Sequence, residues 1–87
     1  KEQRQLRMEF RTTQEQLAKL TDNEKIVLDL LMQGMANKKI ATQLDISLRT
    51  VESRRAKIFE KLKVRSLALL VRKVMTVELA QLELKSS

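Results

Sequence analysis

The chain has 87 residues, which is enough for one small domain, because a folded chain of this size buries only about 60% of the surface that its unfolded form exposes. It contains no Pro, Trp or Tyr and a single Gly, while Leu, Glu, Lys, Arg and Gln dominate. This composition favours helices, because the β-branched and aromatic enrichment of strands is missing.

The residue types that are absent exclude several classes of function. Without Cys or His, the chain has no disulfide framework, no thiolate nucleophile, no imidazole catalysis and no zinc site. It also lacks a Gly-rich phosphate loop and a clustered pair of carboxylates, so we predict that it is not an enzyme and uses no metal or other cofactor. No run of about 18 apolar residues and no signal-peptide pattern is present, which predicts a cytoplasmic protein without a membrane partner. The first residue is Lys1, which indicates a fragment of a longer protein.

The net charge of +7 is unevenly distributed. Residues 1–36 carry six basic and six acidic side chains, whereas residues 37–73 carry eleven basic and three acidic ones. A charge excess confined to one stretch creates a directed field that attracts a polyanion. The alternative is a solvated helical surface without a binding role.

The first predicted helix covers about residues 2–19. Its apolar stripe has the spacing of a heptad repeat over about two heptads, with one Thr in the seam. Such a helix is marginal alone, so we expect a linker helix that packs on the domain or pairs with its copy in a dimer. A helix that covers part of the core is an equally good interpretation. The stripe consists of Leu6, Phe10, Thr13, Leu17 and Leu20.

Two helices are predicted next. Thr21 and Glu24 form a capping box, in which each side chain accepts a hydrogen bond from the backbone amide of the other. Gly34 ends this helix, because it tolerates a positive φ. Asn37 is predicted to be the N-cap of a short helix that ends at Leu44.

The segment 45–47 is too short for anything but a tight turn between two helices. Asp45 adopts the left-handed region more easily than most residues, and Ser47 can cap a helix over about 48–62. Ser66 caps a last helix, whose pattern after Thr76 fits alternation as well as helix. We predict a helix that frays there, and domain boundaries that divide the chain into 1–19, 20–77 and 78–87.

A short helix, a three-residue turn and a longer polar helix form a helix-turn-helix, which presents its second helix to the major groove of DNA. Projection at 100° per residue places Val51, Ile58 and Leu62 on the inner side of that second helix. On the outer side, the small residues Ser53 and Ala56 let the helix approach the base edges. The predicted base contacts are Arg49, Glu52, Ser53 and Ala56. The predicted phosphate contacts are Lys38, Lys39, Thr50, Arg54, Arg55, Lys57 and Lys61. For Arg55, an inward side chain paired with a carboxylate is an equally good interpretation.

The run from Leu20 to Leu62 resembles the LuxR-type (FixJ/NarL) DNA-binding domain of bacterial transcription factors. The likeness includes the Glu24 capping turn, Gly34, Asn37-Lys38-Lys39-Ile40-Ala41, Ile46-Ser47, Thr50-Val51-Glu52 and Lys61-Leu62, and it extends through Ser66 into the last helix. It implies an all-α fold, with a four-helix domain that contains the helix-turn-helix and follows the N-terminal linker helix. It also implies base reading by Glu52, Ser53 and Ala56, and a dimer on paired half-sites made by the last helix. We therefore expect dimer contacts at Leu67, Leu70, Val71 and Val74.

Two functions from different classes remain open. In the first, the chain is the effector domain of a response regulator, and phosphorylation of a preceding receiver domain controls its dimerisation. Its partners would be double-stranded DNA, a second copy of the chain at least on DNA, and RNA polymerase. In the second, the chain is a helical protein-interaction module, and its basic face is incidental. Salt separates the two, because phosphate contacts lose affinity steeply between about 50 and 200 mM salt and an apolar helix interface does not.

Overall fold

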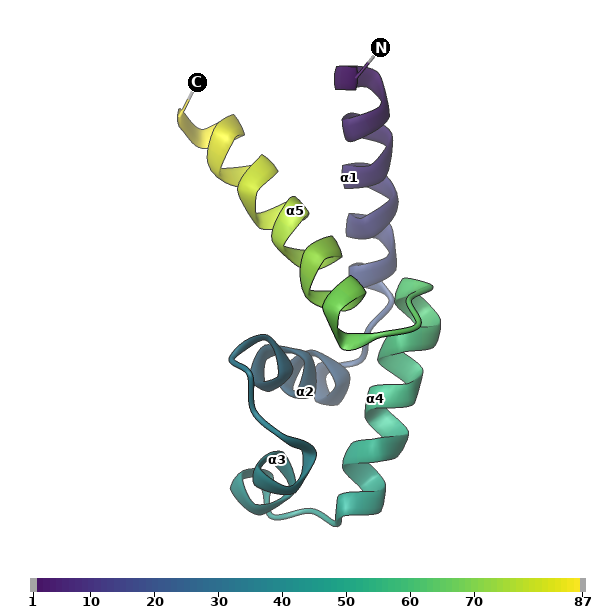
Figure 1. Ribbon diagram of the computed structural model, residues 1–87, viewed down its shortest axis with the longest axis vertical. Helices are drawn as coiled ribbons and strands as arrows, with labels where there is room; N and C mark the ends of the chain where they lie inside the picture. The colour runs from purple at the N-terminus through teal and green to yellow at the C-terminus, as the bar shows by residue number, and fades with distance from the viewer. Residues whose placement is uncertain (1, 87) are drawn as a thin grey trace.

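The computed structural model describes residues 2–86, and it describes side chains for residues 7–83. In this part of the chain all regular structure is helical, which confirms the all-α prediction of a four-helix domain preceded by an N-terminal helix. The molecule is elongated, 45 × 24 × 21 Å, and both ends of the chain lie at the same end of the long axis (Figure 1). The helices are α1 (Glu2–Ala18), α2 (Asp22–Met32), α3 (Asn37–Leu44), α4 (Leu48–Leu62) and α5 (Leu67–Ser86).

The start and the end of α2 follow the sequence prediction. Thr21 Oγ1 accepts from the Glu24 amide at 3.1 Å and Glu24 Oε1 accepts from the Thr21 amide at 2.9 Å, so the capping box is complete. At the other end Gly34 has φ +83°. The amides of Gly34 and Met35 donate to the carbonyl oxygens of Leu31 and Leu30, which is the Schellman pattern that ends a helix.

The predicted N-cap of α3 is wrong by one residue. Ala36 is the N-cap and makes no side-chain cap hydrogen bond, while Asn37 is already inside the helix. The Asn37 side chain cannot serve the helix end because its Oδ1 accepts a hydrogen bond from Arg55 in α4. At the other end of α3, Asp45 has the predicted left-handed conformation, with φ 55°.

Hydroxyl caps begin the last two helices, as predicted. Ser47 Oγ accepts from the Thr50 amide at 3.0 Å, and Ser66 Oγ accepts from the Leu69 amide at 3.2 Å. Lys63 ends α4 with φ 57°, a left-handed residue that the sequence analysis did not identify. Helix α5 continues unbroken through Ser86, so the predicted boundary between residues 77 and 78 falls inside a helix.

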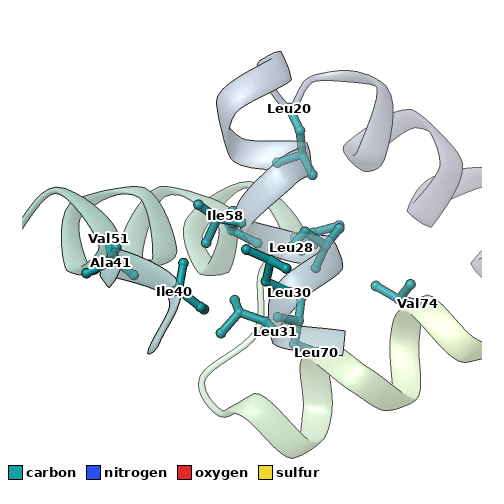
Figure 2. Close-up of a cluster of buried hydrophobic side chains, with 12 residues drawn as sticks. Leu20, Leu28, Leu30, Leu31, Ile40, Ala41, Val51, Ile58, Leu70 and Val74 are labelled. Carbon is teal, nitrogen blue, oxygen red and sulfur yellow. The ribbon is translucent and has the colours of Figure 1, made fainter. Parts of the chain in front are cut away.

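One hydrophobic core joins α2, α3, α4 and the first half of α5 (Figure 2). Val51, Ile58 and Leu62 of α4 are completely buried, as the helical projection predicts. Ala41 is the small residue at the contact between α3 and α4, where its methyl group permits close approach of the helices. The core consists of Leu20, Val27, Leu28, Leu30, Leu31, Ile40, Ala41, Val51, Ile58, Leu62, Leu70 and Val74.

The predicted dimer contacts need correction at two positions. Leu70 is 0% exposed and Val74 is 6% exposed in the single chain, so neither side chain has surface left for a second copy. Both face the α2 side of the core, because the apolar stripe of α5 is used to close the domain (Figure 2). Leu67 and Val71 are half-buried.

Helix α1 packs on the domain through its C-terminal half. Thr13 is 3% exposed and Leu17 packs against the core, and α1 contacts both α4 and α5. Towards the chain ends α1 and α5 diverge (Figure 1). Phe10 is half-buried, and the side chain of Leu6, the first residue of the predicted stripe, lies outside the described residues.

No described helix combines the length and the apolar character that a membrane span needs.

Candidate nucleic-acid interface

Helices α3 and α4 form a helix-turn-helix around the turn 45–47. The chain reverses at Asp45, whose amide donates to the Thr42 carbonyl oxygen, and the Ile46 amide donates to the Ala41 carbonyl oxygen at 3.0 Å. The Ile46 side chain packs against the core beneath the turn. These backbone bonds and the packed side chain of Ile46 hold the turn itself in place.

The outer face of α4 is a low ridge. Ser53 and Ala56 are exposed on the side opposite the buried residues Val51 and Ile58. Arg49 and Glu52, the other predicted base contacts, are exposed on the same outer side, in the first two turns of α4. The structure therefore brings all four predicted base-contacting residues to one solvent-facing surface.

The predicted phosphate contacts divide into two groups. Lys38, Lys39 and Lys57 are exposed at the edges of the ridge, on α3 and α4. Thr50 and Arg54 are half-buried, and the Thr50 hydroxyl lies 2.8 Å from the Ser47 hydroxyl at the start of α4. Among the described residues, none of the three lysines has an intramolecular ion pair, so their ammonium groups can reach a polyanion.

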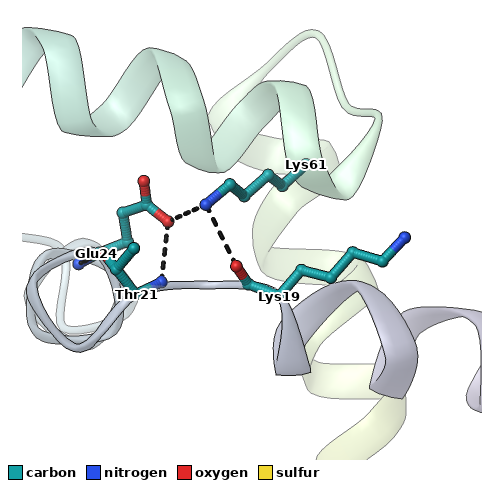
Figure 3. Close-up of polar contacts among 4 residues, drawn as sticks. All are labelled: Lys19, Thr21, Glu24 and Lys61. Carbon is teal, nitrogen blue, oxygen red and sulfur yellow. Dashed lines mark hydrogen bonds and ion pairs between the residues drawn. The ribbon is translucent and has the colours of Figure 1, made fainter.

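Lys61 does not belong to this surface. Its Nζ donates to Glu24 Oε1 at 2.6 Å and to the Lys19 carbonyl oxygen at 3.1 Å (Figure 3). The side chain of Lys61 is 30% exposed and that of Glu24 is 5% exposed. The ammonium group of Lys61 therefore holds the end of α4 against the start of α2, and the phosphate contact at Lys61 stays a prediction.

Glu24 is the acidic half of this contact. The hydrogen bond from Lys61, with a further one from the Thr21 amide, holds the pKa of the Glu24 carboxyl below its ordinary value of 4.5, although burial acts in the opposite direction. The carboxylate is thus charged throughout the neutral range. It accepts one hydrogen bond from the amide at the start of α2 and one from the ammonium group of Lys61 in α4.

Arg55 is also engaged by intramolecular partners. Its Nη1 donates to Asn37 Oδ1 at 2.9 Å, and its Cζ lies 5.2 Å from the centroid of the Phe59 ring. The side chain is half-buried. The inward interpretation from the sequence is therefore supported, with an amide in place of the expected carboxylate.

A lysine of α5 also contacts the C-terminal end of α4. Lys73 Nζ donates to the Leu62 carbonyl oxygen at 2.6 Å, where a cation stabilises the negative end of the helix dipole. Burial lowers the pKa of Lys73. This contact is absent from the sequence analysis, because nothing in the spacing of Leu62 and Lys73 indicates it.

Comparison with known proteins agrees with this geometry. Residues 18–74 match the family described as bacterial regulatory proteins, luxR family, which is more than half of the chain. The chain belongs to the luxR family of bacterial regulatory proteins. The matched residues contain the core of α2 to α5 and both helices of the helix-turn-helix.

The relatives of this luxR-family chain are named as response regulators or transcriptional regulators. The transcriptional regulatory protein FixJ of Rhizobium meliloti is 48% identical over 56 residues, which are 64% of this chain and 28% of that protein. The tetrathionate response regulatory protein TtrR of Salmonella typhimurium is 41% identical over 54 residues, which are 62% of this chain and 26% of that protein.

Solved structures agree in fold. The response regulator StyR superposes with a TM-score of 0.78 at 42% identity, over 85% of this chain and 37% of that one. Full-length FixJ from B. japonicum superposes with a TM-score of 0.76 at 33% identity, over 86% of this chain and 37% of that one. The chain thus spans little more than a third of these response regulators.

Proposed function

We propose that this luxR-family domain binds double-stranded DNA in a sequence-specific manner as a transcriptional regulator, with α4 in the major groove. The observation that carries this proposal is the ridge of Ser53 and Ala56 between exposed cations, on the face of α4 opposite its buried side. A major groove about 12 Å wide admits a helix, and small residues on the leading face allow a deep approach.

The exposed residues of the first two turns of α4 suit base reading. The Arg49 guanidinium can donate two hydrogen bonds to a guanine edge, and the Glu52 carboxylate can accept from a cytosine amino group. The Ala56 methyl group can contact a thymine methyl. Arg49 and Glu52 lie in the N-terminal half of α4, where a recognition helix contacts bases, and Ala56 lies one turn beyond Glu52 on the same helix.

The set of phosphate contacts is smaller than the sequence predicts. We assign it to Lys38, Lys39, Thr50, Arg54 and Lys57, because Arg55 and Lys61 are held by intramolecular partners. These contacts fix the register on the duplex without reading sequence.

The regulatory setting is part of the proposal. StyR is a response regulator and TtrR is a tetrathionate response regulatory protein, and this chain spans only part of each. We infer a cytoplasmic regulator in which phosphorylation of a receiver domain controls dimerisation on paired half-sites, with RNA polymerase as a further partner. The dimer face on α5 would then use exposed residues in place of Leu70 and Val74, namely Met75, Leu79 and Leu82.

Selection of binding sites from random duplexes with the purified domain tests the function. A DNA-reading domain enriches a defined motif, and symmetry and spacing in that motif report the dimer. Its affinity falls steeply between about 50 and 200 mM salt. If no motif emerges and the affinity for a protein partner is independent of salt, the protein-interaction module is the correct function.

A further inference from the structure

Arg55 joins the two helices of the helix-turn-helix. Its guanidinium donates to Asn37, 18 residues earlier and at the first position of α3, and it lies over the ring of Phe59, one turn further along α4. Among the described residues, no other side-chain hydrogen bond connects α3 with α4.

Helix α3 depends on such a contact more than the other helices do. It has only eight residues, its N-cap Ala36 makes no side-chain cap hydrogen bond, and helices this short are not stable alone. Its apolar anchors, Ile40 and Ala41, lie in the middle of the helix. The bond to Asn37 therefore fixes the end of α3 that the core does not hold.

That end of α3 carries Lys38 and Lys39, next to Asn37 in the sequence and exposed. If they contact phosphates while α4 reads bases, the distance between the start of α3 and the outer face of α4 must match the distance between the phosphates and the base edges of the duplex. A displacement of either helix then breaks the contacts of the other. A hydrogen bond and a cation–π contact hold the guanidinium, and its planar shape allows it to make both at once, with an N–H on its edge and a face that can stack on a ring.

We propose that Arg55 is a positioning residue for DNA recognition, which sets the spacing between the phosphate-binding start of α3 and the base-reading face of α4 through Asn37 and Phe59. This inference rests on the proposed function. A positioning role and a phosphate contact at Arg55 predict different results for two measurements: the salt dependence of DNA binding, and the affinity of the charge-conserving variant Arg55→Lys.

The test compares Arg55→Met, Arg55→Lys, Asn37→Ala and the double variant Arg55→Met/Asn37→Ala on the selected DNA site. We expect each single variant to weaken specific binding about tenfold, a typical coupling between contacting residues, and the double variant to be no weaker than the weaker single one. Arg55→Lys is expected to fail although it keeps the charge, because an ammonium group lacks the planar fork. The slope of log affinity against log salt should stay unchanged in all four.

Two matched controls accompany these variants. Lys57→Met removes an exposed cation on the same helix and should lower the salt slope by about one. Asn23→Ala removes the other Asn of the chain, which is exposed on α2, and should bind like the wild type.

A second measurement does not need DNA. The chain has no Cys, so spin labels at Gln43→Cys and Glu60→Cys, both exposed, report the α3 to α4 distance alone. The distance distribution should broaden in Asn37→Ala and in Arg55→Met but not in Lys57→Met.

The outcomes distinguish failure of the positioning role of Arg55 from failure of the proposed DNA-binding function. If Asn37→Ala binds DNA like the wild type while Arg55→Met lowers the salt slope by about one and Arg55→Lys restores it, Arg55 is a phosphate contact and its positioning role is overturned. Unchanged distance distributions overturn that role as well. If the wild type itself shows no salt-dependent binding to any duplex, the proposed function fails, and the role of Arg55 fails with it.

Discussion

The Nζ atom of Lys61, in the last turn of α4, lies 2.6 Å from Oε1 of Glu24, in the first turn of α2. The same Oε1 accepts from the Thr21 amide, and the same Nζ donates to the Lys19 carbonyl oxygen directly after α1 (Figure 3). Lys61 therefore connects the end of α4 with the start of α2 through an ion pair and with the end of α1 through a hydrogen bond.

Removal of the cation should destabilise the domain. We expect Lys61→Met to lower the free energy of unfolding by about 1–3 kcal/mol, because it leaves the buried Glu24 carboxylate without its cation and removes the hydrogen bond to the Lys19 carbonyl oxygen, while the Thr21 amide still donates to Glu24. Urea unfolding measures the difference. The exposed Lys57 gives the matched control, and Lys57→Met should change stability by less than about 0.5 kcal/mol.

DNA binding, measured where both variants are fully folded, should show the reverse pattern: Lys57→Met changes its salt dependence and Lys61→Met does not. The salt slope should be unchanged in Lys61→Met and about one lower in Lys57→Met. A lower slope in Lys61→Met with unchanged stability would restore the phosphate contact that the sequence predicts.

The lowered pKa of Glu24 makes part of the stability dependent on pH. Because the folded state holds the carboxyl pKa below its unfolded value, the ionised carboxylate contributes its full stabilisation above the unfolded pKa, near 4.5. That contribution is lost as the pH falls from this value through the folded pKa. The stability difference between wild type and Glu24→Gln should therefore be constant at neutral pH and shrink on acidification.

Thermal or urea unfolding at a series of pH values checks this, with Asp29→Asn as the control, since Asp29 is exposed on the same helix and has no ion pair among the described residues. A wild-type to Glu24→Gln difference that persists unchanged at low pH would show that shape and hydrogen bonding, and not charge, account for the effect of Glu24.

The accuracy of sequence prediction in this chain depends on how local each signal is. The capping box of Thr21 and Glu24 and the positive φ of Gly34 are determined within a few residues, and both are confirmed. The buried side of α4 follows from its period alone. The partners of Glu24 and Asn37 lie 37 and 18 residues away, and only the packed helices bring them together.

The same reasoning explains the correction on α5. Periodicity identifies an apolar stripe, but it does not say whether the stripe closes the domain or binds a second copy. Leu70 and Val74 are used inside the domain because α5 packs over α2. Glu24 is a buried capping acid, and because buried charges are paired, its burial in the folded domain indicates a cation from a distant part of the chain.

A large side chain on the ridge of α4 should prevent specific recognition. We expect Ser53→Leu to abolish binding to the selected site, because the added branched side chain holds α4 away from the base edges, while the exposed position leaves the fold intact. Footprinting and circular dichroism give the two readouts. Thr12→Leu, an equivalent change at an exposed position of α1, should bind normally. A wild-type footprint from Ser53→Leu would mean that another surface reads the DNA.

A charge introduced on the buried face of α5 should unfold the domain, whereas a charge on its exposed face should leave the stability unchanged. Val74 is 6% exposed inside the core, so Val74→Asp should unfold the domain through an unpaired carboxylate in an apolar environment. Leu79 is 57% exposed, and with Met75 and Leu82 it forms a stripe at spacings of four and three residues. Leu79→Asp should therefore keep the helical content and the melting temperature.

On DNA with two half-sites, Leu79→Asp should bind each half-site with unchanged affinity but without cooperativity, because charge repulsion disrupts a dimer face on α5. Quantitative gel-shift titrations on single and paired half-sites separate these terms, with Gln81→Glu on the neighbouring surface of α5 as a charge-matched control. If Leu79→Asp remains cooperative, two copies meet through another surface, and the surface of α1 at Met8, which is 67% exposed, is the next region to test.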